Sequence, residues 1–459
     1  MQFVAKINVD LFLTRKRERK AEKKRRQLKL RRSSRARAQF FRFAKSGVFG
    51  TSSVIVGMLS QLAKSGLPMS QTSLSLHIPK NFSMLNSPED AIEFVSEFAF
   101  TFQNRSISDV FVDFADVKKQ DLGAHALLDK LVDEIVAQTA FRGTRMGWKG
   151  NFPNDPSQMR FVKAMGIIRQ LGLTHRYLEV TDANKIHLFE RRCRHYVRNI
   201  RPINPDDKSQ QANAAERFVN HVDRCLAKEG RKLTLEGRSQ LCSYVVEVID
   251  NAENHAGLVD WTIQGYVDMA MDQPECEIVI FNFGKSISTT LEELAEGSYT
   301  RAQIQTYLDL HEKNGWLSPK WRREDLLTLI ALQGAVSSKN SAEEHTRGQG
   351  TADLIEFFQQ MNDERKFIGI HPASMYIVSG GTRILFDSKY RLVRGEDGSR
   401  VIAFNESNDL KKPPDSACVI PLRGGCRLPG TMIGIKFAVQ PSILQQTEHI
   451  EKNHELAKS

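Results

Sequence analysis

One segment, Leu235 to His255, constrains the fold most, because its apolar residues recur with the period of a helix. Its polar residues Glu247, Asn251 and His255 are spaced four apart, so they share one face of that helix. The apolar stripe consists of Leu241, Val245, Ile249 and Ala252. The sequence therefore predicts an amphipathic helix with a row of polar groups.

The polar row contains the residue types that an ATP site needs. A magnesium ion that bridges phosphates prefers hard oxygen ligands and keeps much of its water, and Asn251 offers a neutral oxygen. Glu247 stands one turn away, where a carboxylate can orient or deprotonate an attacking water. The alternative is a surface helix whose polar face has this spacing by chance.

The run Glu247-Val-Ile-Asp-Asn251-Ala-Glu-Asn-His255 resembles the N-box of the GHKL superfamily, which includes gyrase, heat-shock chaperones, histidine kinases and MutL. The resemblance implies an α/β class fold, a Bergerat-type sandwich of a mixed, mainly antiparallel sheet with helices on one face, over residues 215–440. It implies Mg²⁺ as cofactor with Asn251 as its ligand, Glu247 as the catalytic base, and ATP as ligand or substrate. His255 is expected either at the ATP site or in local packing at the helix end.

The strand Glu277 to Ile287 resembles the first glycine box of the superfamily, where Asn282 replaces the usual aspartate and Ser286 the second glycine. The family aspartate accepts a hydrogen bond from the adenine amino group. Asn282 can still accept through its carbonyl oxygen and can donate to a ring nitrogen. The resemblance implies that Asn282 and Gly284 contact ATP.

A second glycine-rich run precedes the apolar helical segment 352–361. Glycines let the backbone approach phosphate oxygens, and the following helix directs its N–H groups toward them. The polar stretch Ser337 to His345 is expected to form a lid. Its Lys339 and the nearby Arg347 are either phosphate contacts or exposed charges. The ATP contacts implied here are Lys339, Arg347, Gly348, Gly350 and Thr351.

Three later runs, 374–379, 381–386 and 430–437, predict strands, and Gly430-Thr431 resembles the closing strand of the superfamily. Thr431 is expected either to contact adenine or to serve only as a favoured strand residue. A long insertion, Ser288 to Gln333, separates the first box from the lid.

Residues 72–175 alternate strand and helix patterns and predict a small α/β domain: strands at 74–78, 109–114 and 144–148, helices at 88–102, 122–136 and 158–171. The runs Val110 to Val117 and Asp121 to Leu128, with Gly172-Leu173 later, resemble STAS domains. Where that family normally carries a serine that a partner kinase phosphorylates, this sequence has Asp121, Leu122 and Gly123 instead, so no phospho-switch is expected there. The alternative is an unrelated α/β domain.

The net charge of +11 belongs to a tail. Residues 14–45 hold sixteen Lys and Arg against two Glu, about +14, which leaves about −3 for the rest. The first 45 residues are thus expected to be a disordered basic tail that either binds nucleic acid or an anionic membrane, or only aids solubility. The remaining segments are a linker at 46–71, connecting helices at 176–214 and a polar tail at 441–459.

Six cysteines without a Cys-x-x-Cys pair argue against a zinc site or a disulfide framework. The apolar run Val48 to Ala63 is too interrupted to span a membrane. A cytoplasmic protein is therefore expected.

Three functions fit these features. The first is a magnesium-dependent ATPase or ATP-driven switch that acts on the STAS-like half, on a protein partner or on a second protomer. The second is a protein kinase of the anti-sigma or histidine-kinase type, although no phosphoacceptor helix precedes the ATP site. The third is a non-catalytic nucleotide-sensing scaffold anchored by the basic tail.

Overall fold

The computed structural model describes residues 53–144, 146–165, 186–194, 210–229, 231–255, 260–270, 274–333, 349–368, 373–395, 399–439 and 444–446. The chain forms two compact units, and the larger, Val54–Val136 with Arg145–Ser459, contains all the described strands. Its helices and sheets confirm the α/β class. None of the helices in the described ranges has the length and apolar character that crossing a membrane requires.

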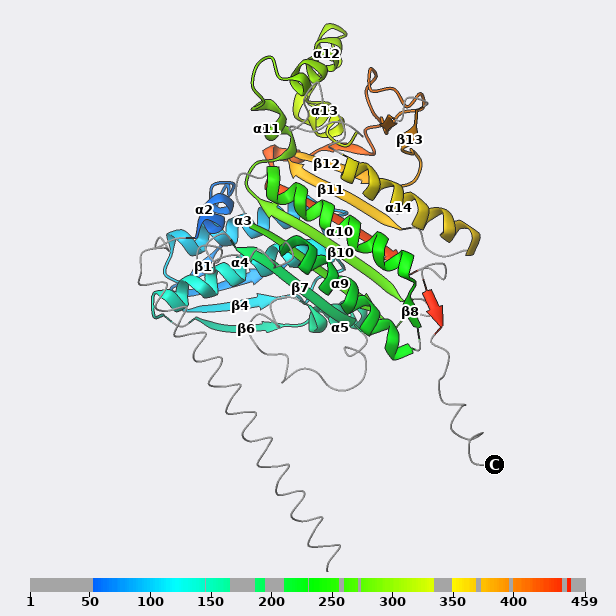
Figure 1. Cartoon of the computed structure of the whole chain (residues 1–459). Coiled ribbons are helices and arrows are strands. Elements are labelled where there is room, and N and C mark those ends of the chain that lie inside the picture. Colours follow the sequence, from blue (N-terminus) through cyan, green and yellow to red (C-terminus); the bar gives the residue numbers. More distant parts are fainter. Residues whose placement is uncertain are drawn as a thin grey trace, which may run out of the picture. The chain divides into compact units, whose positions relative to one another are not determined.

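The first part of the larger unit, called here the N-terminal module, is built on a four-stranded sheet of order β1-β2-β4-β6 in which β2, β4 and β6 are parallel (Figure 1). Along β2, buried Leu74 and Leu76 alternate with exposed residues, as a half-buried strand requires. The strands are β1 (Met69–Ser70), β2 (Ser73–His77), β4 (Asp109–Asp113) and β6 (Gly147–Asn151), with a separate parallel pair β3 (Asn81–Phe82) and β5 (Lys119–Gln120).

Four helices complete the module: α2 (Val54–Ser60), α3 (Pro88–Asn104), α4 (Leu122–Phe141) and α5 (Pro156–Ala164). A proline starts α3 and α5, where its missing N–H costs nothing. The expected strands and helices are confirmed within a few residues, although β6 lies three residues later than expected. The end of the helix expected at 158–171 and Gly172-Leu173 lie outside the described residues.

Two segments differ from expectation. Residues 54–60, within the expected linker, form α2, whose Ile55, Val56 and Leu59 are buried in the core of the module. Residues 186–194, within the expected connecting helices, form β7 (Ile186–Arg194), an edge strand paired with β9. Both segments are short, and the burial of their apolar residues by the rest of the molecule decides their structure.

The second part of the unit is a seven-stranded sheet in which every neighbouring pair is antiparallel. Its order is β15 (Val419–Pro421), β12 (Thr382–Phe386), β11 (Ser374–Gly380), β16 (Leu428–Ala438), β10 (Glu275–Phe283), β9 (Asp260–Asp268) and β7. The strands expected at 374–379, 381–386 and 430–437 are confirmed.

Three helices lie on one face of this sheet: α9 (Gln210–Leu226), α10 (Leu235–His255) and α14 (Gln349–Ile368) (Figure 1). The bounds of α10 match the predicted helix, and its apolar stripe residues Leu241, Val245 and Ile249 are buried in this layer. The side chain of Ala252 lies outside the described residues.

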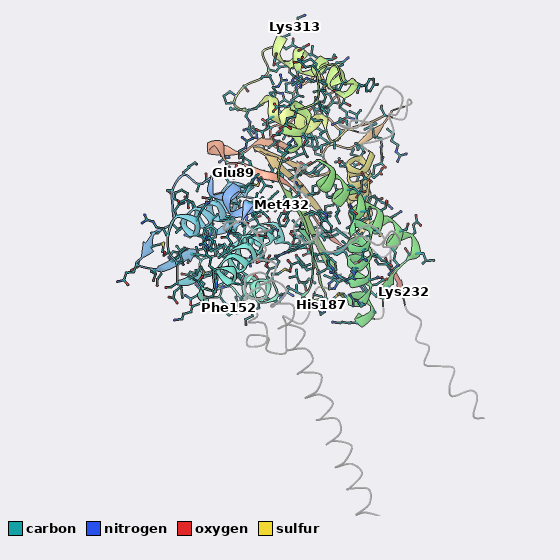
Figure 2. All side chains as sticks on the ribbon, turned by 60° about the vertical axis from the view of Figure 1, so that its left-hand side comes forward. Glu89, Phe152, His187, Lys232, Lys313 and Met432 are labelled. Carbon is teal, nitrogen blue, oxygen red and sulfur yellow. The ribbon has the colours of Figure 1, made fainter. Side chains whose placement is uncertain are left out.

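The opposite face of the sheet is covered by the N-terminal module. Along β10, Ile278 and Ile280 join the core under the helices, whereas Val279, Phe281 and Phe283 join the core of the module. Met432 of β16, labelled in Figure 2, also belongs to the second core. The sheet therefore has an apolar core on each face.

Charged groups are also buried where the module meets the sheet. The fully buried Lys130 of α4 places its Nζ 2.9 Å from Asp260 Oδ2 and 3.2 Å from Glu134 Oε1. Arg192 of β7 pairs with Asp133 of α4, with 2.7 Å between Nη1 and Oδ2. Such pairs are costly to break once buried, so they fix how α4 lies on β9 and β7.

The expected insertion, Ser288 to Gln333, is helical and contains α12 (Tyr299–Lys313), α13 (Arg323–Ile330) and most of α11 (Ile287–Glu292). The smaller remaining elements are β13 (Val393–Arg394) paired with β14 (Arg400–Val401), β8 (Arg231–Leu233) paired with β17 (Leu444–Gln446), and the short 3-10 turns η2 (Ala227–Glu229) and η3 (Arg423–Gly425).

Candidate functional site

The polar face of α10 lies beside the first turns of α14. The rings of Tyr244 on α10 and Phe357 on α14 pack with centroids 4.6 Å apart. Glu247 follows Tyr244 by three residues and is half-buried. Asn251 and His255 occupy the next two turns of α10, but their side chains lie outside the described residues.

The Glu247 carboxyl is electrostatically perturbed. Burial raises its pKa above the ordinary value, and the nearby carboxylates of Asp250 and Asp353 raise it further. Asp353 belongs to α14 and pairs with Arg400 at the start of β14. A carboxylate with a raised pKa is a stronger base than an ordinary one, which is the property that a general base uses.

The end of β10 carries the second group of expected residues. Asn282 is buried, with 4% of its surface exposed, and lies directly opposite Thr431 of β16 in the strand register. Both side chains follow the alternation of Ile278 and Ile280, so they point to the face that carries α10. The structure thus brings Asn282 and Thr431 together.

A row of polar groups continues across the sheet from Thr431. Its Oγ1 lies 2.7 Å from the Oγ of Ser379 on β11, and that Oγ also accepts the N–H of Ile287 at 2.9 Å. Asn282, Thr431 and Ser379 therefore line up on three adjacent strands.

The glycine and serine after Asn282 have separate roles. Gly284 has φ +128°, which favours glycine, and its N–H donates to the carbonyl of Pro429 at 3.1 Å. Ser286 caps α11, because its Oγ accepts the N–H of Thr289 at 3.2 Å. The serine at the second glycine position thus starts the helical insertion.

The second glycine run is only partly described. Gly350 and Thr351 lie in the first turn of α14. Lys339, Arg347 and Gly348, and the expected lid from Ser337 to His345, lie outside the described residues.

A small apolar cavity lies in the core between α10, α14 and the sheet. The cavity there measures about 20 Å³ and is lined by apolar residues such as Val248, Ile280 and Leu354. That volume holds about one water. That cavity is therefore too small for a ligand of nucleotide size.

Comparison with family models, curated proteins and solved structures finds no match. The chemistry of the site is therefore inferred from the residues of this chain alone.

Within the described residues, no three His, Cys, Asp or Glu side chains come together as a metal site. Magnesium held mainly by phosphate and water needs only one or two protein oxygens. Glu247 and Asp250 supply hard oxygens on α10 beside the position of Asn251, so the donor types present fit that ion.

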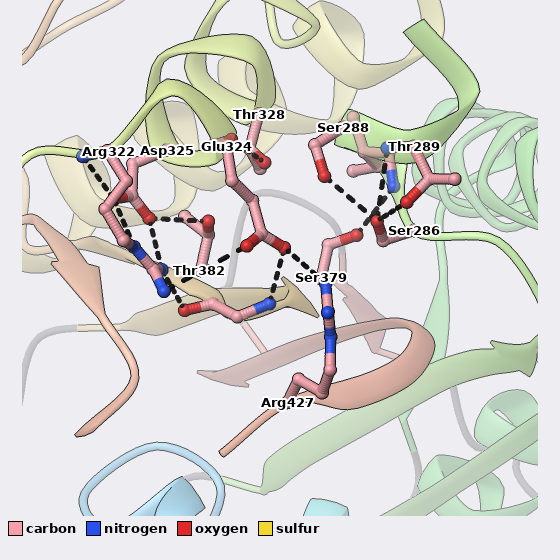
Figure 3. A network of polar contacts seen from close by, with 12 residues as sticks. Ser286, Ser288, Thr289, Arg322, Glu324, Asp325, Thr328, Ser379, Thr382 and Arg427 are labelled. Carbon is pink, nitrogen blue, oxygen red and sulfur yellow. Dashed lines mark hydrogen bonds and ion pairs between the residues drawn. The ribbon is translucent and has the colours of Figure 1, made fainter. Parts of the chain in front are cut away.

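The sequence did not reveal a polar network that ties the insertion to the sheet (Figure 3). The fully buried Asp325 of α13 accepts from Arg322 Nε at 2.9 Å and from Thr382 Oγ1 at 2.7 Å. Glu324 accepts the N–H of Gly381 at 2.8 Å, and Arg427 donates to the same carboxylate oxygen at 3.3 Å. The run Arg322-Arg-Glu-Asp325 places acidic residues at the start of a helix. This is the one sequence signal that could have indicated the network.

Proposed function

We propose that the chain binds Mg-ATP on the helix-covered face of the seven-stranded sheet, between α10 and the start of α14. In this proposal the sheet and its helices form a GHKL-type ATP-binding domain, the N-terminal module is STAS-like, and the protein is an ATPase or ATP-driven switch. The proposal extends the resemblance of residues 247–255 to the N-box.

The observation that carries the proposal is the register of β10 and β16. It sets Asn282 opposite Thr431 on the face of the sheet that α10 covers. An amide and a hydroxyl offer both donors and acceptors, which the edge of an adenine ring requires. Residues nearly 150 positions apart thus supply one polar recognition surface.

The remaining roles follow from position. The first turn of α14, with Gly350 and Thr351, offers backbone N–H groups and the positive end of a helix dipole to phosphate oxygens. Lys339, Arg347 and Gly348 precede that turn and would add phosphate contacts. Asn251 would hold the magnesium ion, which when bound neutralises phosphate charge. Glu247, with its raised pKa, would accept the proton of the attacking water.

Coupling to the N-terminal module would run through β10. The strand places Asn282 toward the helices and its neighbours Phe281 and Phe283 in the core of the module. A shift of β10 on nucleotide binding would therefore reach both faces, which is what a switch requires.

The experiment is ATP binding and turnover by the full chain with Mg²⁺. We expect Asn251→Ala and Asn282→Ala to weaken binding at least tenfold. We expect Glu247→Gln to bind ATP normally and to hydrolyse it about 10²-fold or more slowly. Ser239→Ala, exposed on α10 two turns before Glu247, is the matched control and should behave like the parent.

Two results would contradict the proposal: no ATP binding by the parent chain, or binding that neither Asn251→Ala nor Asn282→Ala weakens. Radiolabelled γ-phosphate appearing on protein, with none released as free phosphate, would assign a kinase instead of an ATPase.

A further inference from the structure

A polar cavity of about 320 Å³ lies on the face of the sheet away from α10 and α14. The starts of α4 and α5 form one wall, and the ends of β9, β10, β11 and β16 form the other. Its size falls at the lower end of the range for small-molecule sites, about 300–1,000 Å³. No residue of the proposed nucleotide site lines it.

The positive groups in the lining already have partners. Arg160 of α5 donates to both carboxylate oxygens of Asp268, at 2.9 and 2.5 Å. The Nζ of Lys436 lies 2.8 Å from Glu275 Oε1. An anionic ligand would have to compete with these carboxylates.

Both helix starts are also occupied by acidic caps. Asp121 Oδ1 accepts the N–H of Ala124 in the first turn of α4 at 2.9 Å. Asp155 Oδ1 accepts the N–H of Ser157 in the first turn of α5 at 2.8 Å. Neither helix start therefore offers its usual anion site.

Two lining carboxylates, Asp121 and Glu277, have no cation at ion-pair distance among the described residues. Asp121 accepts hydrogen bonds from Ser83 Oγ at 2.6 Å and from the N–H of Leu85 at 2.9 Å, in addition to its bond at the start of α4. Glu277 is therefore the carboxylate that we consider for a ligand. It is 3% exposed, and its Oε1 accepts the N–H of Leu122 at 3.1 Å. The charged lining residues are four carboxylates (Asp121, Asp268, Glu275, Glu277) and two cations (Arg160, Lys436). With all of them ionised the lining carries 2 − 4, a charge of −2.

We propose that this cavity binds a small organic cation with a primary ammonium group, which donates to the carboxylate of Glu277. The excess of acceptors over free donors selects a ligand that brings its own N–H groups. The ammonium would neutralise one of the two excess negative charges.

The proposal predicts a defined pH dependence. Burial raises the pKa of Glu277 to about 7, and Asp121 adds to the shift, while Lys436, Tyr266 and the Leu122 N–H oppose it. Asp268 of β9, Glu275 of β10 and Arg160 of α5 complete the charged surroundings. An ammonium favours the ionised carboxylate, so binding releases a proton below pH 7. Affinity should rise about tenfold per pH unit up to pH 7 and level off above it.

The test is calorimetry of the full chain with 1,4-diaminobutane in amine-free and phosphate-free buffer at pH 6 and pH 8. We expect one site per chain, with binding about tenfold weaker at pH 6. Glu277→Gln keeps an acceptor for the Leu122 N–H and should weaken binding at least tenfold at pH 8. Glu406→Gln, an exposed glutamate outside the cavity, is the matched control.

A second variant tests the same cavity in case Glu277→Gln does not fold. Gln158→Lys adds an ammonium group to the cavity from the partly exposed start of α5 and should also block the diamine. The proposal is overturned if the parent does not bind the diamine at millimolar concentration. It is equally overturned if folded Glu277→Gln and Gln158→Lys bind like the parent, or if inorganic phosphate binds in the diamine's place.

Discussion

At the scale of single residues, Glu277 has the most consequential environment. It is a buried carboxyl on a central strand, and burial raises its pKa to about 7 from an ordinary value of 4.5. The folded chain therefore binds this proton more tightly than the unfolded chain. Between pH 4.5 and 7 the contribution of Glu277 to the free energy of unfolding falls as pH rises, since its ionisation is easier in the unfolded state.

Glu277→Gln removes that dependence. Between pH 4.5 and pH 8, we expect its stability relative to the parent to improve by roughly 2 to 3 kcal/mol. Urea unfolding of both proteins across this range measures the difference. The exposed control Glu406→Gln should follow the parent at every pH. A constant difference between Glu277→Gln and the parent would show that the carboxyl ionises with an ordinary pKa.

The sequence predicted which site residues lie together only where their spacing along one helix determines it. Glu247, Asn251 and His255 lie on one helix, and their spacing of four residues was enough to predict that they share a face. The pairing of Asn282 with Thr431 depends on the register between two strands. The sequence predicted both strands but not how they align. Glu277 lies in an apolar run, and only the packing of α4 above it revealed its burial.

At the scale of elements, α13 depends on one buried carboxylate. Asp325 accepts from the backbone N–H and Nε of Arg322 and from Thr382 on β12. Through these bonds the helical insertion is fastened to the hairpin of β11 and β12. Breaking a buried charged network leaves groups that water cannot reach.

Asp325→Ala should therefore destabilise the chain by about 1 to 3 kcal/mol, the cost of leaving the buried hydroxyl of Thr382 without its acceptor. Hydrogen exchange should accelerate most across residues 288–333. Glu296→Gln, exposed in the same insertion, should change neither measurement. Uniform acceleration over the whole chain would instead mean that the insertion and the sheet unfold as one.

Long elements with a strong period were predicted closely. The bounds expected for the helix 235–255 match those of α10, and the strands around 374–386 and 430–437 were found. The short segments α2 and β7 were missed, because seven or nine residues carry too little periodicity to outweigh tertiary packing. For the insertion from Ser288 to Gln333, the sequence predicted the bounds but not the helices.

At the scale of the whole molecule, the larger unit is organised around a sheet with an apolar core on each face. Neither the module nor the sheet with its helices keeps its apolar residues covered without the other. Residues such as Phe281, Tyr376 and Met432 are buried only because the module packs on them.

A fragment of residues 186–446, which lacks the N-terminal module but keeps β7, should therefore expose that face. We expect it to bind a hydrophobic dye and to self-associate, whereas the full chain should do neither and should unfold in one calorimetric transition. A monomeric, dye-silent fragment with a transition of its own would show that the sheet and its helices fold independently.

Both faces of β10 are buried, and this limits the amino-acid substitutions that the strand can accept. In most antiparallel sheets, every second position faces water and tolerates substitution. In β10 the positions from Cys276 to Phe283 are buried on both sides. In a saturation library we expect the large apolar positions of β10 to accept few substitutions, and most accepted changes there to need a compensating change in the layer that the side chain contacts. The polar positions Glu277 and Asn282 should accept uncharged replacements more readily.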